Sequence, residues 1–173
     1  MKASTIFWIV GIFLGIVIVS SVFFNALIQR ETPSLLSFVI VHFSGYLFFL
    51  SVPIEEALLP YYVSLGHSVP LLIFLAVSTA LLAQLIDYGI GYLVPKHFLN
   101  KLIGKSKFLK TKKLIKKYKN LIIFIFNFSL LSSPIICLVA GMERYNFKNT
   151  FFYSFLGLLV KYTVIGYVFS YIF

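Results

Sequence analysis

The sequence predicts an all-α integral membrane protein, in which transmembrane helices are combined with two re-entrant helical hairpins in an inverted repeat. Composition is the first reason: 60% of the 173 residues are hydrophobic and 12% are charged, against roughly 25% charged residues in soluble domains. The second reason is that three apolar stretches have the length of a bilayer crossing. The third is that two other apolar stretches are interrupted by proline and polar residues. We expect one membrane domain, residues 1–173.

Three stretches are predicted to cross the membrane as helices: residues 5–28, 69–94 and 150–173. Each exceeds the roughly 20 residues that a helix needs to cross a hydrocarbon core of about 30 Å. The first is longer than the roughly 7–15 apolar residues of a signal peptide, and no small-x-small cleavage pattern ends it. We therefore expect it to be an uncleaved helix.

The stretch of residues 35–66 is predicted to enter the membrane and return to the same side. Near its centre are Pro53, Glu55, Glu56 and Pro60. Proline removes a backbone donor from a helix, and a charge at the midplane costs at least about 3 kcal/mol. Such a break is tolerated only inside protein or beside water, which favours a re-entrant hairpin over a straight helix.

The stretch of residues 121–142 repeats this pattern. Asn127, Ser132, Ser133 and Pro134 interrupt it. It is too short for two crossings of about 20 residues each. We therefore predict a second re-entrant hairpin.

Ten lysines and no acidic residue lie in residues 96–119, and they fix the predicted orientation. Lysine-rich short loops stay in the cytoplasm, so we predict a cytoplasmic basic loop and a cytoplasmic N-terminus. The unit of a hairpin followed by a crossing helix then occurs twice, and the two hairpins enter the membrane from opposite sides. This is the inverted repeat of many secondary transporters, whose substrate sites lie near the midplane.

Four ionisable residues inside the predicted membrane region are candidates for a substrate or ion site: Glu55, Glu56, Asp87 and Lys161. Such residues are functional candidates by default. Lys161 is far from either end of its helix, so we expect a carboxylate partner, Glu56 or Asp87. The alternative is an ion pair with a purely structural role.

Asp87 shares a helix face with Gln84 and Gly91, and this small, polar face suits close packing against a hairpin. The alternative is that Asp87 is solvated near the cytoplasmic end of its helix. Ser132 and Ser133 are further candidates, since their hydroxyls could bind a phosphate. They could equally satisfy backbone groups that the break in the hairpin frees.

Several function classes are disfavoured. Cys137 is the only cysteine, and the three histidines (His42, His67, His97) do not have the spacing of metal ligands. We therefore expect neither a metal nor a cofactor. The sequence shows no set of a nucleophile, a general base and a residue that orients the base, so we expect no enzyme. The basic loop favours anionic lipid headgroups over nucleic acid as a partner, with a plain topology signal as the alternative. The sequence leaves a homo-oligomer open.

Four segments resemble the DedA superfamily, also called the VTT-domain or SNARE-associated family, and are most similar to its small YqaA-like branch. They are residues 53–57 (PIEEA), 87–91 (DYGIG), 133–142 (SPIICLVAGM) and 157–162 (GLLVKY). The resemblance maps the family's hairpin glutamate onto Glu56. It covers the chain from about residue 50 to its end.

The resemblance implies lipid translocation across a prokaryotic cytoplasmic membrane, by a flippase or scramblase of phospholipid or polyprenyl phosphate. Glu56 and Asp87 would be proton-linked, and Lys161 would contact the lipid phosphate or balance the acids. Two arginines typical of the family's second hairpin are replaced here by Asn127 and Ser133. A small-ion or small-solute secondary transporter and a non-transporting membrane scaffold are the alternatives.

Overall fold

The computed structural model describes residues 34–47, 54–97, 104–129 and 133–172; the side chains of residues 54–56 and 133–134 are outside this description. Every regular element among these residues is an α-helix, as expected, and the described part contains no strand. The predicted crossing helix at residues 5–28 lies outside the described residues.

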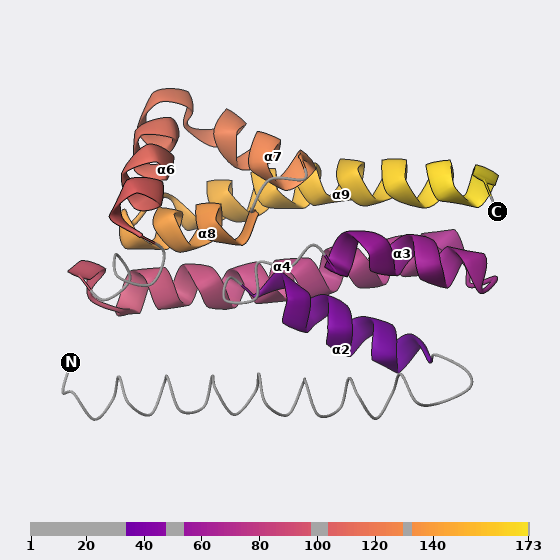
Figure 1. Cartoon of the computed structure of the whole chain (residues 1–173). Coiled ribbons are helices and arrows are strands. Elements are labelled where there is room, and N and C mark those ends of the chain that lie inside the picture. The colour runs from indigo at the N-terminus through magenta and orange to yellow at the C-terminus, as the bar shows by residue number, and fades with distance from the viewer. Residues whose placement is uncertain (1–33, 48–53, 98–103, 130–132, 173) are drawn as a thin grey trace, which may run out of the picture.

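Two long helices run side by side along the molecule in opposite directions (Figure 1). They are α4 (Val69–Leu93) and α9 (Phe147–Ile172), and both are long and apolar enough to cross a membrane. Pro70 lies in the first turn of α4, where its missing N–H is not needed. At about 1.5 Å per residue α4 is about 37 Å long, more than the hydrocarbon core.

Two short helices, α2 (Leu35–Tyr46) and α3 (Ile54–Ser64), lie beside the N-terminal part of α4 and the C-terminal part of α9 (Figure 1). A capping box between Ser34 and Ser37 begins α2. After α3, Gly66 takes a positive φ of 83°. Its N–H and that of His67 bond back to the last turn of the helix, which reverses the chain into α4.

Two other short helices, α7 (Asn120–Phe128) and α8 (Ser133–Met142), lie at the opposite end of the long pair (Figure 1). α8 ends like α3: Arg144 takes a positive φ of 52°, and the N–H groups of Arg144 and Tyr145 bond back to the helix. Both hairpin stretches are thus pairs of short helices. That they are re-entrant and related by inverted symmetry stays a prediction.

The basic segment is not the loop that its composition suggests, because it contains the amphipathic helix α6 (Lys105–Tyr118). Phe108, Thr111 and Ile115 recur at helical spacing and are buried. Lysine is a good helix former, so a run of lysines does not oppose a helix once one face is anchored. Figure 1 shows α6 lying across the end of the bundle, transverse to α4 and α9.

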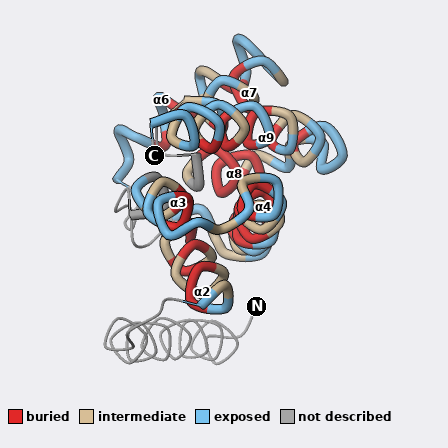
Figure 2. The backbone as a smooth tube through the Cα atoms, turned by 90° about the vertical axis from the view of Figure 1, so that its right-hand side faces the viewer, coloured by how far each residue is buried: buried red, intermediate tan, exposed pale blue. Residues whose placement is uncertain are grey.

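The apolar core forms two clusters, one at each end of the bundle. We call α2, α3 and the adjoining parts of α4 and α9 the first half; α6, α7, α8 and the remaining parts of α4 and α9 are the second half. Seen along the long helices (Figure 2), α8 is buried over most of its length.

In the second half, glycines bring backbones into contact. A Cβ on Gly91 of α4 would overlap the Leu138 carbonyl of α8, and a Cβ on Gly141 of α8 would overlap the Tyr88 carbonyl of α4. A Cβ on Gly157 of α9 would lie 2.7 Å from the Phe124 carbonyl oxygen of α7. Small residues permit such close packing between membrane helices.

Candidate functional site

Polar side chains gather inside each half of the molecule. The first group, which we call the basic centre, lies between α2, α4 and α9, and its five residues are each less than a tenth exposed. It consists of His42, Tyr46, Thr79, Lys161 and Tyr162. A buried polar cluster is unusual beside helices that are apolar enough to span a membrane, because neither lipid nor packing requires it.

His42 ties the basic centre together. Its Nδ1 lies 2.8 Å from the Thr79 hydroxyl of α4, and its Nε2 lies 2.8 Å from the Tyr162 hydroxyl of α9. The Thr79 hydroxyl donates to the Leu75 carbonyl at 2.7 Å, so it accepts from Nδ1–H. In the neutral ring Nε2 then accepts from Tyr162. One side chain of α2 therefore bridges both long helices.

Lys161 brings a cation into this centre. The residue is only 4% exposed, which agrees with its predicted position deep in the membrane region. Its Nζ lies 5.9 Å from the ring centroid of Tyr46 and 5.6 Å from that of Tyr162. Cation–π contacts of this kind are strongest when the cation is desolvated.

The second group, which we call the amide centre, lies between α4, α7, α8 and α9. Gln84 donates to the Asn127 side-chain oxygen, and the Asn127 amide donates to Ser154 at 3.1 Å and to the Ile123 carbonyl at 2.9 Å. The Cys137 thiol donates to the Gln84 oxygen at 3.2 Å. All four side chains of the centre are buried.

Asp87 lies one turn beyond Gln84 on α4 and is fully buried, so the alternative that it is solvated at the helix end is wrong. Gly91, one further turn along, is buried against α8. The expectation that Gln84, Asp87 and Gly91 form one face packed against a hairpin is confirmed.

The two centres follow one plan. In each, a polar side chain from the first helix of a hairpin bonds to both long helices: His42 from α2 and Asn127 from α7. On the long helices, their partners Gln84 and Tyr162 lie equally far from the first residues of α4 and α9. The centres differ in chemistry, since only the first holds a cation.

The other predicted site residues are placed less fully. Glu55 and Glu56 lie in the first turn of α3 and Ser133 begins α8, but their side chains are outside the described part. Ser132 lies outside the described residues. The carboxylate partner predicted for Lys161 therefore stays a prediction. Lys161 belongs to the basic centre, and Asp87 lies one turn beyond Gln84 of the amide centre.

Sequence reasoning missed His42, Tyr46 and Tyr162. His42 is the only histidine in α2, a mainly apolar helix without charged residues, and this could have marked it. The aromatic rings carry no such signal, because tyrosine is also common at membrane interfaces.

Two ion pairs join three segments of the chain at α6. Glu143, just after α8, contacts Lys96 at 2.9 Å and Lys112 of α6 at 2.8 Å. Burial alone would raise the pKa of Glu143, but the hydrogen bonds from Lys112 and Lys96 outweigh it, so the pKa lies below its ordinary value.

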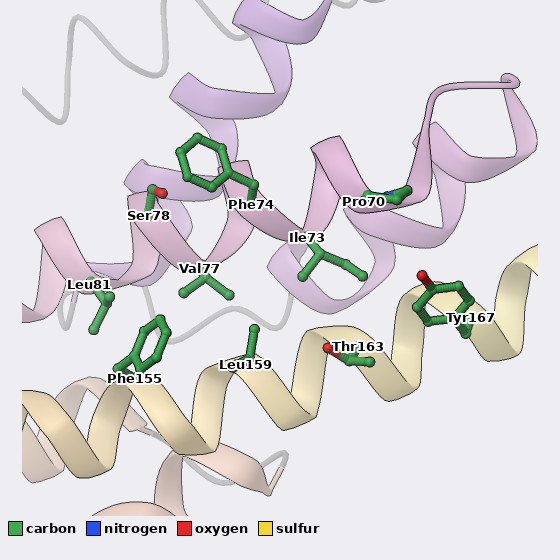
Figure 3. Close-up of a pocket in the computed structure, with 10 residues that line it drawn as sticks. All are labelled: Pro70, Ile73, Phe74, Val77, Ser78, Leu81, Phe155, Leu159, Thr163 and Tyr167. Atoms are coloured by element: carbon green, nitrogen blue, oxygen red, sulfur yellow. The ribbon is translucent and has the colours of Figure 1, made fainter.

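An apolar groove of about 560 Å³ lies between α4 and α9 in the first half. Figure 3 shows Ile73 and Val77 of α4 pointing toward Leu159 of α9. The α9 residues that line the groove, such as Leu159 and Thr163, recur at every fourth position. Lys161, midway between these two, lies on the opposite face of α9.

Comparison with known proteins gives one match. A family model described as VTT domain matches residues 37–171, which include every described helix except the beginning of α2 and the end of α9. No curated protein and no solved structure matches the chain.

Proposed function

Since this chain belongs to the VTT-domain family, the family of DedA and SNARE-associated proteins, we propose that it moves a lipid with a phosphate-bearing headgroup across a membrane. The family indicates a membrane location, and α4 and α9 have the length and composition of membrane spans. The membership of the YqaA-like branch stays a prediction.

One observation carries the proposal: a lysine lies buried, together with His42 and two tyrosines, midway along a spanning helix. A cation at this depth is costly to keep, so its retention favours a role in binding an anion. Phosphate oxygens accept hydrogen bonds from ammonium, imidazole and phenol groups. The basic centre contains all three kinds, and in this conformation the imidazole N–H is bonded to Thr79 and the Tyr162 hydroxyl to His42, so these two donors would have to exchange partners to bind a phosphate.

The arrangement of the helices supports alternating exposure of this centre. α2 packs on α4 and α3 on α9; at the other end α7 packs on α9 and α8 on α4. Both hairpins end in the same type of turn, at Gly66 and Arg144. Each short helix thus has a counterpart in the other half, and the counterpart packs on the other long helix. An inverted repeat requires this pattern.

The groove favours a lipid over a water-soluble substrate. It is lined mainly by apolar side chains and lies between two spanning helices, where an acyl chain would be the neighbour. Because Lys161 faces the other side of α9, the headgroup and the groove are separated in this conformation. A lipid that used both would need a movement of the first hairpin.

The test is translocation of a fluorescent phospholipid in proteoliposomes. Lys161→Met should slow translocation at least about tenfold, the usual cost of losing one charge-assisted contact. Lys161→Arg should restore part of the rate. Lys148→Met is the matched control, because Lys148 is an exposed lysine of the same helix, and its rate should equal that of the wild type.

The same assay tests the predicted roles of the carboxylates Glu56 and Asp87. Glu56→Gln should also reduce the rate if this carboxylate takes part in the cycle. A rate that does not respond to a pH gradient would remove the proton-linked step for Glu56 and Asp87. No translocation by the folded wild type, with phospholipids and polyprenyl phosphates, would favour a solute carrier or a scaffold.

A further inference from the structure

The helix α6 has the orientation of an interfacial helix. It lies transverse to α4 and α9 (Figure 1). If the two long helices cross the bilayer, α6 lies parallel to its surface. Amphipathic helices rich in lysine commonly lie in this plane and attract anionic lipids.

The side chains of α6 divide into a buried strip, an outer strip and two lateral strips. Phe108, Thr111 and Ile115 are buried against the bundle. Lys110, Lys113 and Lys117 are exposed and, by helical spacing, face directly away from that buried strip. On each side of the helix, between the buried and the outer strip, runs a lateral strip that would face the surrounding lipid.

One side of the helix carries the clearest lateral strip, formed by Lys105, Leu109 and Lys116. Leu109 is 44% exposed, although an exposed leucine between lysines gains nothing from water. Lys105 and Lys116 are exposed on either side of it. A leucine that enters the acyl region between two lysines at headgroup depth is the pattern of a membrane contact.

The charge of α6 points to an anionic partner. Lys112 and Lys116, and Lys113 and Lys117, are like-charged pairs at i, i+4, which weaken a helix in water. Glu143 neutralises Lys112 but touches none of the other lysines of α6. Phosphates of a membrane surface would relieve the repulsion that remains.

We propose that α6 binds the headgroups of anionic phospholipids through the lateral strip of Lys105, Leu109 and Lys116. This site is separate from the basic centre, and it does not depend on whether the protein transports lipid. It would fix α6 at the surface and, through Glu143, the end of α8 with it.

The experiment follows amide hydrogen exchange of residues 105–118 in the full chain, in phosphatidylcholine nanodiscs with increasing phosphatidylglycerol. Phosphatidylglycerol should slow exchange in α6, and high salt should reverse the effect. Each lysine at an anionic surface contributes a factor of roughly five to binding. Lys105→Gln with Lys116→Gln should therefore raise the phosphatidylglycerol needed for half protection more than tenfold.

The matched control changes the same charge on the outer strip. Lys110→Gln with Lys113→Gln should raise that requirement much less. Equal effects of the two double variants would overturn the lateral site, and so would exchange that is the same with and without phosphatidylglycerol. Protection by inorganic phosphate or an oligonucleotide in pure phosphatidylcholine, but not by phosphatidylglycerol, would overturn the membrane assignment.

Discussion

The two halves of the molecule hold their polar centres in place by different means. In the second half, Gly91, Gly141 and Gly157 bring helix backbones into direct contact around the amide centre. In the first half, α2 packs on its neighbours through rings: Phe38 meets Tyr62 of α3 and His42 meets Tyr162 of α9 edge to face, each pair with centroids 5.2 Å apart. The comparison suggests which half is the fixed frame.

Backbone contact at a glycine tolerates little displacement, because any shift loses close packing that no side chain can restore. Contacts between aromatic side chains can shift or change rotamer at lower cost. If one hairpin moves while a lipid crosses, we therefore expect α2 and α3 to move relative to a static group of α4, α8, α7 and α9. The predictions below test this difference.

The largest effect on stability is expected where α4 and α8 touch. Gly141→Ala places a methyl group against the Tyr88 carbonyl, and overpacking of this kind costs up to about 3 kcal/mol. The thermal midpoint in detergent should fall steeply. Gly89→Ala is the control, since a Cβ there meets no atom within 4 Å. Equal midpoints for the two variants would contradict the role given to the glycine contact.

An intermediate effect is expected from the residues that bridge the long helices. Asn127→Leu leaves the Gln84 amide without its acceptor, which should cost about 1–2 kcal/mol. His42→Phe should cost less, because an aromatic ring stays, Thr79 keeps its bond to the Leu75 carbonyl, and only the Tyr162 hydroxyl loses its acceptor, whereas Asn127→Leu removes three hydrogen bonds. Chemical or thermal unfolding of both variants in one detergent measures the difference.

The two bridging variants should rank in the opposite order for transport. His42→Phe should reduce lipid translocation strongly, while Asn127→Leu that remains folded should retain most of the rate. A His42→Phe protein that translocates normally, or that is the less stable of the two, would remove the contrast between a working centre and a structural one.

The smallest effect is expected at Glu143. A carboxyl whose pKa is lowered by folding stabilises the protein above its ordinary pKa of 4.5, and this contribution is lost as the pH falls through the folded value. Glu143→Gln should thus cost about 0.5–1 kcal/mol at neutral pH, as partly exposed ion pairs do. Unfolding midpoints measured from neutral to acidic pH should begin to approach each other below the ordinary pKa and converge for variant and wild type below the folded value. A constant gap would mean that charge is not the cause.

Much of the fold could be predicted from the sequence, because long apolar segments have few alternatives in a membrane. The ranges 69–94 and 150–173 differ from α4 and α9 by only a few residues. Lys161 was found because a lysine in the middle of an apolar helix is conspicuous. Asp87 and Gly91 were found because their spacing puts them on one face.

The rest could not be predicted because it depends on contacts between distant segments. That His42 meets Tyr162, or that Asn127 meets Gln84, follows from how four helices cross, which no local pattern contains. The helix α6 was missed for another reason. Charge dominated its interpretation, although the spacing of Phe108, Thr111 and Ile115 was visible in the sequence.

The only cysteine of the chain has a practical consequence for spectroscopy. Cys137 is fully buried and its thiol donates to Gln84, so aqueous maleimides should leave it unmodified. Spin labels or fluorophores can then be attached to cysteines introduced at exposed positions, such as Leu82 and Tyr61, with the amide centre intact. The distance between α3 and α4 could be followed in this way during turnover, without first building a cysteine-free protein.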